Sequence, residues 1–253
     1  MKKRTGWILV GLTLLITFMD ITGLPTALFL NLKIQDVEPF YWTLMVNFLL
    51  IGGISWAVLH FLCPEFHLGM GASGLKEGLQ KYGWPILLIT AVSFIGFYVG
   101  LFPYEGHPSF LKVLVEGIVY YIGVAIVEEL YVRGLLLNLL EQWLHKRADR
   151  TFLAVVFSSL LFGLGHIPGT LGMPFYVIAC KVVWTISMGF FFGMLYKKSG
   201  NLWLPIFAHY CINLTALPYC FSTLRGYAPL TLVIVVPAYV ILGIYSLAQL
   251  DHS

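Results

Sequence analysis

Charged side chains are scarce in this sequence: Asp, Glu, Lys and Arg make up 11% of its 253 residues, against about 25% in soluble domains. Hydrophobic residues make up 59%, and the polar stretches between apolar segments are short. This composition excludes an ordinary soluble protein and predicts an integral membrane protein. The net charge of +3 comes from Lys and Arg clustered between apolar segments, so it gives no reason to expect nucleic-acid binding.

The sequence also lacks the usual motifs for disulfide and metal chemistry. None of the four cysteines forms a CxxC pair or another metal-ligand spacing, and their apolar surroundings predict reduced, buried thiols. There is no HExxH motif, which would indicate a helical zinc protease site. The cysteines are Cys63, Cys180, Cys211 and Cys220.

Long apolar segments are abundant, and a helix needs about 20 such residues to cross a bilayer. Eight segments qualify, although the fifth and seventh are short and suit helices that line an interior cavity. The sequence therefore predicts an all-α, polytopic membrane bundle of about eight transmembrane helices that forms a single membrane domain, residues 1–253. The segments lie at about 6–30, 40–62, 84–103, 112–143, 151–166, 173–196, 202–217 and 228–248.

The distribution of basic residues predicts the orientation of this bundle. With the N-terminus inside, ten of the fifteen Lys and Arg fall in cytoplasmic segments, so the positive-inside rule places both termini in the cytoplasm. The apolar run after the N-terminal MKKRTGW is longer than the core of a signal peptide (about 7–15 residues) and lacks a clear cleavage site. We therefore expect an uncleaved first helix. The short loops and compact length suggest a bacterial plasma-membrane protein.

The longest polar connection, 64–83, allows two interpretations. Leu75, Leu79 and Tyr82 recur at helical spacing beside charged residues, which is typical of a short helix lying on the cytoplasmic surface. An ordinary loop fits equally well.

An ionisable cluster interrupts the apolar stretch 117–140. It consists of Glu128, Glu129 and Arg133. Each charge near the centre of a bilayer costs a few kcal/mol on insertion scales, and a helix that only had to span would use Leu or Val there. An intramembrane cluster of this kind indicates a functional site.

Three more polar residues interrupt neighbouring apolar segments at similar depth. With a rise of about 1.5 Å per residue, Glu128 lies roughly 22 Å from the end of its helix near Trp143. On the same rise, His166, His209 and Asn213 lie roughly 24, 16 and 22 Å from the basic residues that begin or precede their helices. A carboxylate, two imidazoles and an amide on three helices could therefore meet in one pocket.

Structural roles also fit several of these residues. Glu129 and Arg133 are four apart, so they share a helix face and are expected to form an intramembrane ion pair. Asp20 and Lys181 are the other charged residues in apolar segments, and we expect structural roles for both. Glu128 has no obvious partner on its own helix, and shielding a carboxylate from water makes it a stronger base.

Together the motifs resemble the signature of the CAAX-processing and bacteriocin-processing (CPBP) intramembrane proteases, which include the type II CAAX prenyl endopeptidases. The stretch GFFFGMLYKKSGNLWLPIFAHYCIN, 189–213, is also similar to the family's usual approach to its third motif. The resemblance implies a catalytic core at about 112–217 and a cavity within an eight-helix bundle. The motifs are Glu128-Glu129-x-x-x-Arg133, Phe162-x-x-x-His166 and His209-x-x-x-Asn213.

The resemblance implies peptide-bond hydrolysis. In this reading Glu128, assisted by His166, activates the attacking water, while Glu129 and Arg133 order the site. His209 and Asn213 support the oxyanion. No cofactor is expected, although Glu128, His166 and His209 could supply a catalytic zinc if the enzyme were metal-dependent.

A water nucleophile suits the residues better than a side-chain nucleophile. Ser158 and Ser159 lie about two helical turns from His166, and Cys211 is on a different helix face from the residues that flank it. We therefore expect an endopeptidase that acts on a hydrophobic, membrane-associated peptide or protein.

Two other functions remain open. One is a non-enzymatic role in bacteriocin immunity or as a scaffold. The other is a small transporter that couples protons through the same residues, although the inverted repeats typical of transporters are not evident in the sequence.

Overall fold

The computed structural model describes residues 11, 15, 34–102, 104, 106–222, 224 and 226–251. Apart from an isolated bridge between Ile34 and Val37, the regular structure of these residues is helical. Six helical runs are long and apolar enough to cross a membrane. The predicted all-α, polytopic membrane bundle is thus confirmed, and the protein is a multi-pass membrane protein. The first predicted span, 6–30, and Asp20 lie outside the described residues, except for positions 11 and 15.

The helices follow one another with short connections. In chain order they are α2 (Pro39–Ala57) with η1 (Val58–Leu62), α3 (Ala72–Gly100), α4 (Phe110–Lys112), η2 (Val113–Val119), α5 (Tyr120–Glu129), η3 (Leu130–Leu137), α6 (Asn138–Trp143), α7 (Arg150–Leu164), η4 (Pro168–Thr170), α8 (Phe175–Ser199), α9 (Trp203–Thr215), α10 (Leu217–Cys220) and α11 (Pro229–Asp251).

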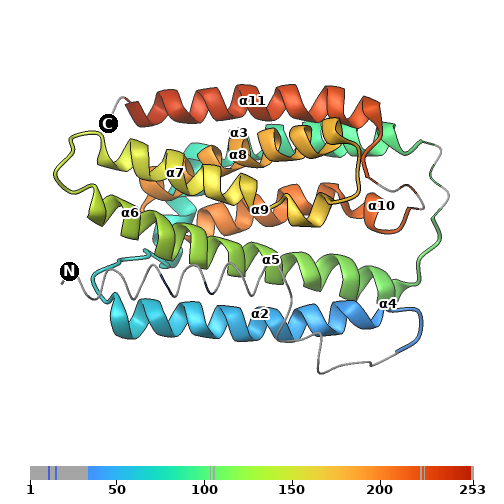
Figure 1. Ribbon diagram of the computed structural model, residues 1–253, viewed down its shortest axis with the longest axis horizontal. Helices are drawn as coiled ribbons and strands as arrows, with labels where there is room; N and C mark the ends of the chain where they lie inside the picture. Colours follow the sequence, from blue (N-terminus) through green and yellow to red (C-terminus); the bar gives the residue numbers. More distant parts are fainter. Residues whose placement is uncertain are drawn as a thin grey trace.

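The long helices lie side by side along one axis of the molecule (Figure 1). In this view α2 and α11 form opposite edges of the bundle, with α5 and α9 between them. Helix α8 packs against α7 and α11, while α9 contacts α3, α5 and α8. Because α9 has neighbours on several sides, one face of it lies in the interior, where Leu204, Ala208 and Ile212 are buried.

Helix α3 begins twelve residues before the predicted span at 84–103. The polar stretch 64–83 is therefore divided: 64–71 is largely irregular, and 72–83 is the first part of a membrane helix. This part packs on the bundle, since Gly74 and Gly78 lie against Asn201 and Leu204, and Tyr82 is buried. Periodicity could not reveal this continuation because Pro85, which usually ends a helix, lies inside α3.

Helix α9 is shorter than a membrane span. Its 13 residues cover about 20 Å, whereas the hydrocarbon core of a bilayer is about 30 Å thick. The count of eight spanning helices stays a prediction, because six candidates lie in the described part of the chain.

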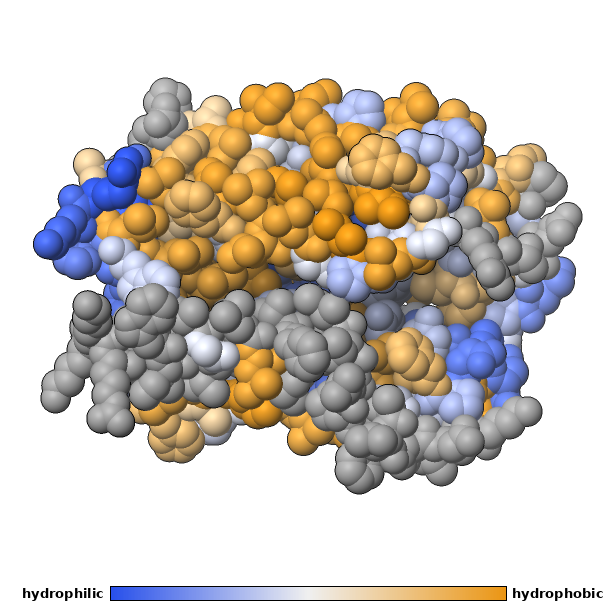
Figure 2. Space-filling model, viewed as in Figure 1, coloured by the Kyte–Doolittle hydropathy of each residue, from blue (hydrophilic) through white to orange (hydrophobic). Residues whose placement is uncertain are grey.

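Basic side chains collect at one end of the bundle. Lys197 Nζ lies 2.5 Å from Glu141 Oε2, which brings the end of α8 to the end of α6. The start of α3 reaches the same end, because Gly69 lies against Gly200 in the α8–α9 turn. The space-filling view shows apolar side chains across the middle of the described surface and hydrophilic ones toward its two ends (Figure 2). The basic residues at this end are Lys76, Lys81, Lys146, Arg147, Arg150, Lys197 and Lys198.

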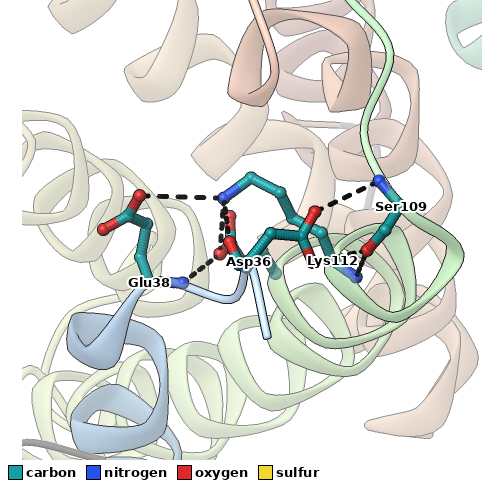
Figure 3. A network of polar contacts seen from close by, with 5 residues as sticks. Asp36, Glu38, Ser109 and Lys112 are labelled. Carbon is teal, nitrogen blue, oxygen red and sulfur yellow. Dashed lines mark hydrogen bonds and ion pairs between the residues drawn. The ribbon is translucent and has the colours of Figure 1, made fainter. Parts of the chain in front are cut away.

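A polar network fastens α2 to η2 at the opposite end (Figure 3). The carboxylate of buried Glu116 accepts the backbone N–H of Glu38 at 2.6 Å and Lys112 Nζ at 2.8 Å. Ser109 Oγ donates to Asp36 Oδ1 at 2.6 Å, and Lys112 Nζ also donates to the Asp36 carbonyl at 3.0 Å. These bonds set the start of α2 against the start of the helix that carries the ionisable cluster.

Candidate active site

The ionisable cluster lies where its helix changes geometry. Glu129 is the last residue of α5, and Arg133 follows in η3, a π-helical stretch with wider turns. Such stretches are rare and occur often at functional sites. Asn138 Nδ2 donates to the carbonyl oxygens of Arg133 at 3.3 Å and Gly134 at 2.9 Å, which satisfies backbone groups at the end of the wide turns.

The expected ion pair between Glu129 and Arg133 is present and fully buried. Arg133 Nη1 donates to Glu129 Oε1 at 2.9 Å, and both side chains are 0% exposed. Arg133 Nη2 donates to the Gly189 carbonyl at 3.3 Å, and the guanidinium lies over the rings of Phe162 and Phe192. The pair therefore joins η3 to α7 and α8, which carry these partners.

His209 connects the third motif to the first. Its Nδ1 lies 2.9 Å from Glu129 Oε1, and its ring stacks on Phe192 at a centroid distance of 4.9 Å. Because an ionised carboxylate only accepts hydrogen bonds, Nδ1 carries a proton, and the bond fixes the ring orientation. Nε2 then faces Glu128 Oε2 at 3.8 Å, which is longer than a hydrogen bond.

His166 is oriented by its own backbone. Helix α7 ends at Leu164, two residues before the end of the predicted segment 151–166, and Pro168 lies just beyond. His166 Nδ1 lies 2.8 Å from the Phe162 carbonyl oxygen, which can only accept a hydrogen bond. Nδ1 therefore carries the proton, and Nε2 keeps a lone pair that can accept one.

Two adjoining cavities lie inside the bundle. The smaller, of about 220 Å³, is lined by four of the predicted residues, Glu128, His166, His209 and Asn213. Glu128 and His166 also line the larger cavity, of about 520 Å³. Glu129 and Arg133 do not line either cavity; they lie behind the wall, where they hold His209 and the α7 and α8 backbones.

The larger cavity is mostly apolar and borders the outer surface of the bundle. Leu161 and Leu164 line it and are about half exposed on α7, so it meets the lipid-facing side of that helix. Its other apolar walls come from α2, α5 and η3: Leu44, Phe48, Val124, Val132 and Leu136.

Three cavity residues were not expected at the site. Tyr120, Lys181 and Tyr227 line both cavities. Lys181 Nζ lies over the ring of Trp184 at 4.3 Å. In the sequence the two tyrosines cannot be distinguished from the many interfacial aromatic residues. Lys181 stands out, because it is a single lysine in an apolar segment. Ser158, Ser159 and Cys211 line neither cavity.

The cavity residues include possible metal ligands, His166, His209 and Glu128. In the described ranges, no three His, Cys, Asp or Glu side chains are arranged to hold a metal ion. The buried Arg133 beside His209 adds positive charge, which disfavours a bound cation. Hydrolysis without a metal stays a prediction.

Comparison with known protein families identifies the domain that contains all six predicted residues. Residues 108–215 match the family described as Type II CAAX prenyl endopeptidase Rce1-like. This part of the chain is similar to the CAAX proteases. The match supports intramembrane endopeptidase activity of the CAAX type, as the three motifs led us to expect. Neither a curated protein nor a solved structure matches the chain.

Proposed function

We propose that this protein is a CAAX-type protease that hydrolyses a peptide bond in a hydrophobic, membrane-associated peptide or protein, with water as the nucleophile. The observation that carries the proposal is that Glu128, His166, His209 and Asn213, from three helical runs, line one cavity inside an apolar bundle. These residue types supply a base, a proton carrier and hydrogen-bond donors, which are the groups amide hydrolysis requires.

Glu128 is the general base in this mechanism. Its side chain is 16% exposed and borders both cavities, so it can reach a water molecule beside a bound peptide. Glu128 takes a proton from this water, and the hydroxide oxygen bonds to the scissile carbonyl carbon. The C–N bond then breaks, and the proton passes to the leaving amine, so the carboxylate is restored. General acid–base help of this kind contributes about 10²- to 10⁴-fold.

His166 assists in moving this proton. Its Nδ1 proton is held by the Phe162 carbonyl, so Nε2 is the nitrogen that can accept a proton from water or pass one to the leaving amine. The residue lines the same two cavities as Glu128.

Asn213 and His209 stabilise the negative charge that develops on the carbonyl oxygen. The Asn213 amide donates to this oxyanion, and His209 does so through Nε2 when its ring carries both protons. Losing one such donor in soluble proteases costs about 2.7–4 kcal/mol in the barrier. Glu129 supports this role, because its carboxylate oxygen accepts from His209 Nδ1 at 2.9 Å.

The apolar walls of the larger cavity support a hydrophobic substrate. A prenyl group, an aliphatic peptide stretch or part of a membrane helix would cover the exposed cavity residues Leu161 and Leu164. Because the larger cavity borders the outer face of α7, such a substrate can enter from the lipid. We further propose that the basic end of the bundle is cytoplasmic in a bacterial plasma membrane.

Cleavage by the purified protein in lipid nanodiscs tests this function. The probes are an internally quenched CAAX-type peptide with a farnesyl group and the same peptide without it. Wild-type protein is expected to cleave at least one, with the site located by mass spectrometry. His166→Ala and Asn213→Ala are each expected to lower kcat by about 10²- to 10³-fold. Glu65→Gln, on an exposed loop, is the matched control and should keep full activity.

The alternative, a scaffold or immunity role without catalysis, predicts a different result. Neither peptide would be cleaved above the rate of empty nanodiscs, and the variants would retain the cellular function of the wild type. That outcome would overturn the peptidase proposal.

A further inference from the structure

Lys181 brings a positive charge to the site. It lies on α8 and lines both cavities together with Glu128 and His166. With a rise of about 1.5 Å per residue, it is roughly 24 Å from Lys197, close to the roughly 22 Å that separates Glu128 from Trp143. Since the ends of α6 and α8 meet, the ammonium reaches the cavities at a depth similar to that of the proposed base.

Nothing in the described part of the chain neutralises this charge at close range. Lys181 Nζ makes no hydrogen bond or ion pair there; its contacts are the rings of Trp184 at 4.3 Å and Tyr227 at 5.7 Å. Arg133 and Lys197, by contrast, each have a carboxylate within 3 Å. A lysine without a carboxylate inside a membrane bundle is costly, so the site favours a negatively charged ligand.

The ligand that best completes this site is a carboxylate. A carboxylate oxygen forms a short, charge-assisted bond with an ammonium group, about twice as strong as a neutral hydrogen bond. The ammonium lies near the rings of Trp184 and Tyr227, and Lys181 lines both cavities. An uncharged ligand would leave the lysine as costly as before.

The two cavities also suggest how a peptide lies. Glu128 and His166 are shared by both, so a chain that passes from one cavity to the other places a peptide bond beside them. The larger cavity is apolar and borders lipid, whereas the smaller carries His209, Asn213 and Thr185. The polar end of the peptide therefore belongs in the smaller one.

We propose that Lys181 binds a carboxylate of the peptide substrate in the smaller cavity, while the apolar part of the substrate occupies the larger one. The carboxylate is either the free C-terminus or an acidic side chain near the scissile bond. This inference rests on the proposed peptidase function. It makes Lys181 a specificity-determining residue that selects peptides by charge on one side of the cleaved bond.

Matched peptides test this proposal. Two fluorescently labelled hydrophobic peptides are identical except that one ends in a carboxylate and the other in an amide. The two peptides of a second pair differ by Glu or Gln beside the scissile bond. Kd is measured by fluorescence anisotropy in nanodiscs, and KM and kcat by cleavage. The proteins are the wild type, Lys181→Met, Lys181→Arg and Lys198→Met, which removes a lysine of the same helix far from the cavities.

Lys181→Met is expected to raise Kd and KM for one carboxylate peptide by about 10- to 100-fold, the usual effect of losing a bond to a charged group. The Kd and KM of the uncharged partner peptide should change less than about twofold, because that peptide has no charged group to lose a bond. Lys181→Arg should retain most of the preference, and Lys198→Met all of it. A response of the carboxylate and amide pair identifies the terminal carboxylate as the ligand. A response of the Glu and Gln pair identifies the side-chain carboxylate.

Other results overturn the proposal. If Lys181→Met weakens the binding of charged and uncharged peptides equally, the lysine only balances charge or supports the fold. If the wild type does not prefer a carboxylate in either pair yet cleaves the peptides, the carboxylate site is wrong and the peptidase function stands. If the preference depends on Lys181 but nothing is cleaved, the peptidase function is wrong instead. Should Lys181→Met fail to fold, the wild-type protein must still prefer the carboxylate peptide of one pair, and Lys181→Arg must keep that preference. Failure of either result overturns the proposal.

Discussion

His209 Nδ1 lies 2.9 Å from Glu129 Oε1, so the helix that carries the third motif is bonded directly to the helix that carries the first. The same oxygen accepts Arg133 Nη1 at 2.9 Å. One carboxylate thus orients a proposed oxyanion donor and neutralises a buried guanidinium. The second glutamate of the Glu-Glu pair therefore acts through its neighbours, whereas the first faces the cavities.

Replacing Glu129 with Gln is expected to destabilise the protein by about 3–5 kcal/mol, because a buried ion pair that loses one partner leaves an uncompensated charge. Arg133 is the stranded group, since it is 0% exposed. Unfolding of the purified protein in detergent micelles, followed by tryptophan fluorescence, gives the free energy.

The double variant Glu129→Leu/Arg133→Met is the matched control. It removes both charges and should recover most of the lost stability. It should stay inactive, since His209 loses its orienting partner. Equal destabilisation in the single and double variants would contradict a role for the pair in charge compensation.

Gly189→Ala should cost about 1–3 kcal/mol of stability, as overpacking usually does. A Cβ there would lie 2.7 Å from Ser159 Cβ and 2.9 Å from Ser159 Cα, so α7 and α8 would have to separate. The bond from Arg133 to the Gly189 carbonyl would shift with them. Gly53→Ala is the control: no neighbour lies within 4 Å, so this variant should be neutral or slightly more stable in thermal unfolding. Equal melting temperatures for the two variants would contradict close packing at Gly189.

Chelation should leave the peptidase active. The described residues contain no group of three ligands suited to a metal, and the mechanism uses water activated by a carboxylate. The measurement is the cleavage rate after prolonged treatment with 1,10-phenanthroline and removal of the chelator, with thermolysin as a parallel positive control. Activity that disappears and returns only with added zinc would contradict the mechanism.

The network in Figure 3 should make stability depend on acid pH. The hydrogen bond from Ser109 to Asp36 holds the pKa of the Asp36 carboxyl below its ordinary value. Because the folded pKa lies below the unfolded one, this contribution is present above about pH 4 and is lost as pH falls through the folded value.

The stability difference between wild type and Asp36→Asn is therefore expected to be constant near neutral pH and to shrink below about pH 4. Melting temperatures across this range check the trend. Ser109→Ala removes the same bond from the other side and should behave alike. A difference that stays constant down to acid pH would mean that the bond to ionised Asp36 contributes nothing.

Much of the architecture follows from hydrophobicity, which is the dominant physical constraint on a membrane chain. Spans at 40–62, 112–143, 173–196 and 228–248 match helical runs to within a few residues. The helical spacing of Leu75, Leu79 and Tyr82 allowed a short helix in 64–83, but it did not show that this helix continues through Pro85 into the membrane span. The wide turns of η3 were missed for a similar reason, since no sequence pattern distinguishes them from α-helix.

The candidate site could be predicted from the sequence where polar residues interrupt an apolar helix. Glu128, His166, His209 and Asn213 stood out for that reason, and the helix rise placed them at similar depth. Which nitrogen of each histidine faces the cavity could not be predicted, because it depends on bonds to Glu129 and the Phe162 carbonyl. The position of Lys181 in the cavity wall also depends on how α8 is rotated, which only the packed bundle determines.

Cleavage kinetics of Glu128→Gln in nanodiscs test the central claim most directly. This change keeps the side-chain shape and removes the base. We expect kcat to fall by about 10²- to 10⁴-fold while the Kd of the peptide changes little, because binding does not need the proton acceptor. A Glu128→Gln protein that folds, binds the peptide and cleaves it within about tenfold of the wild-type rate would contradict the account.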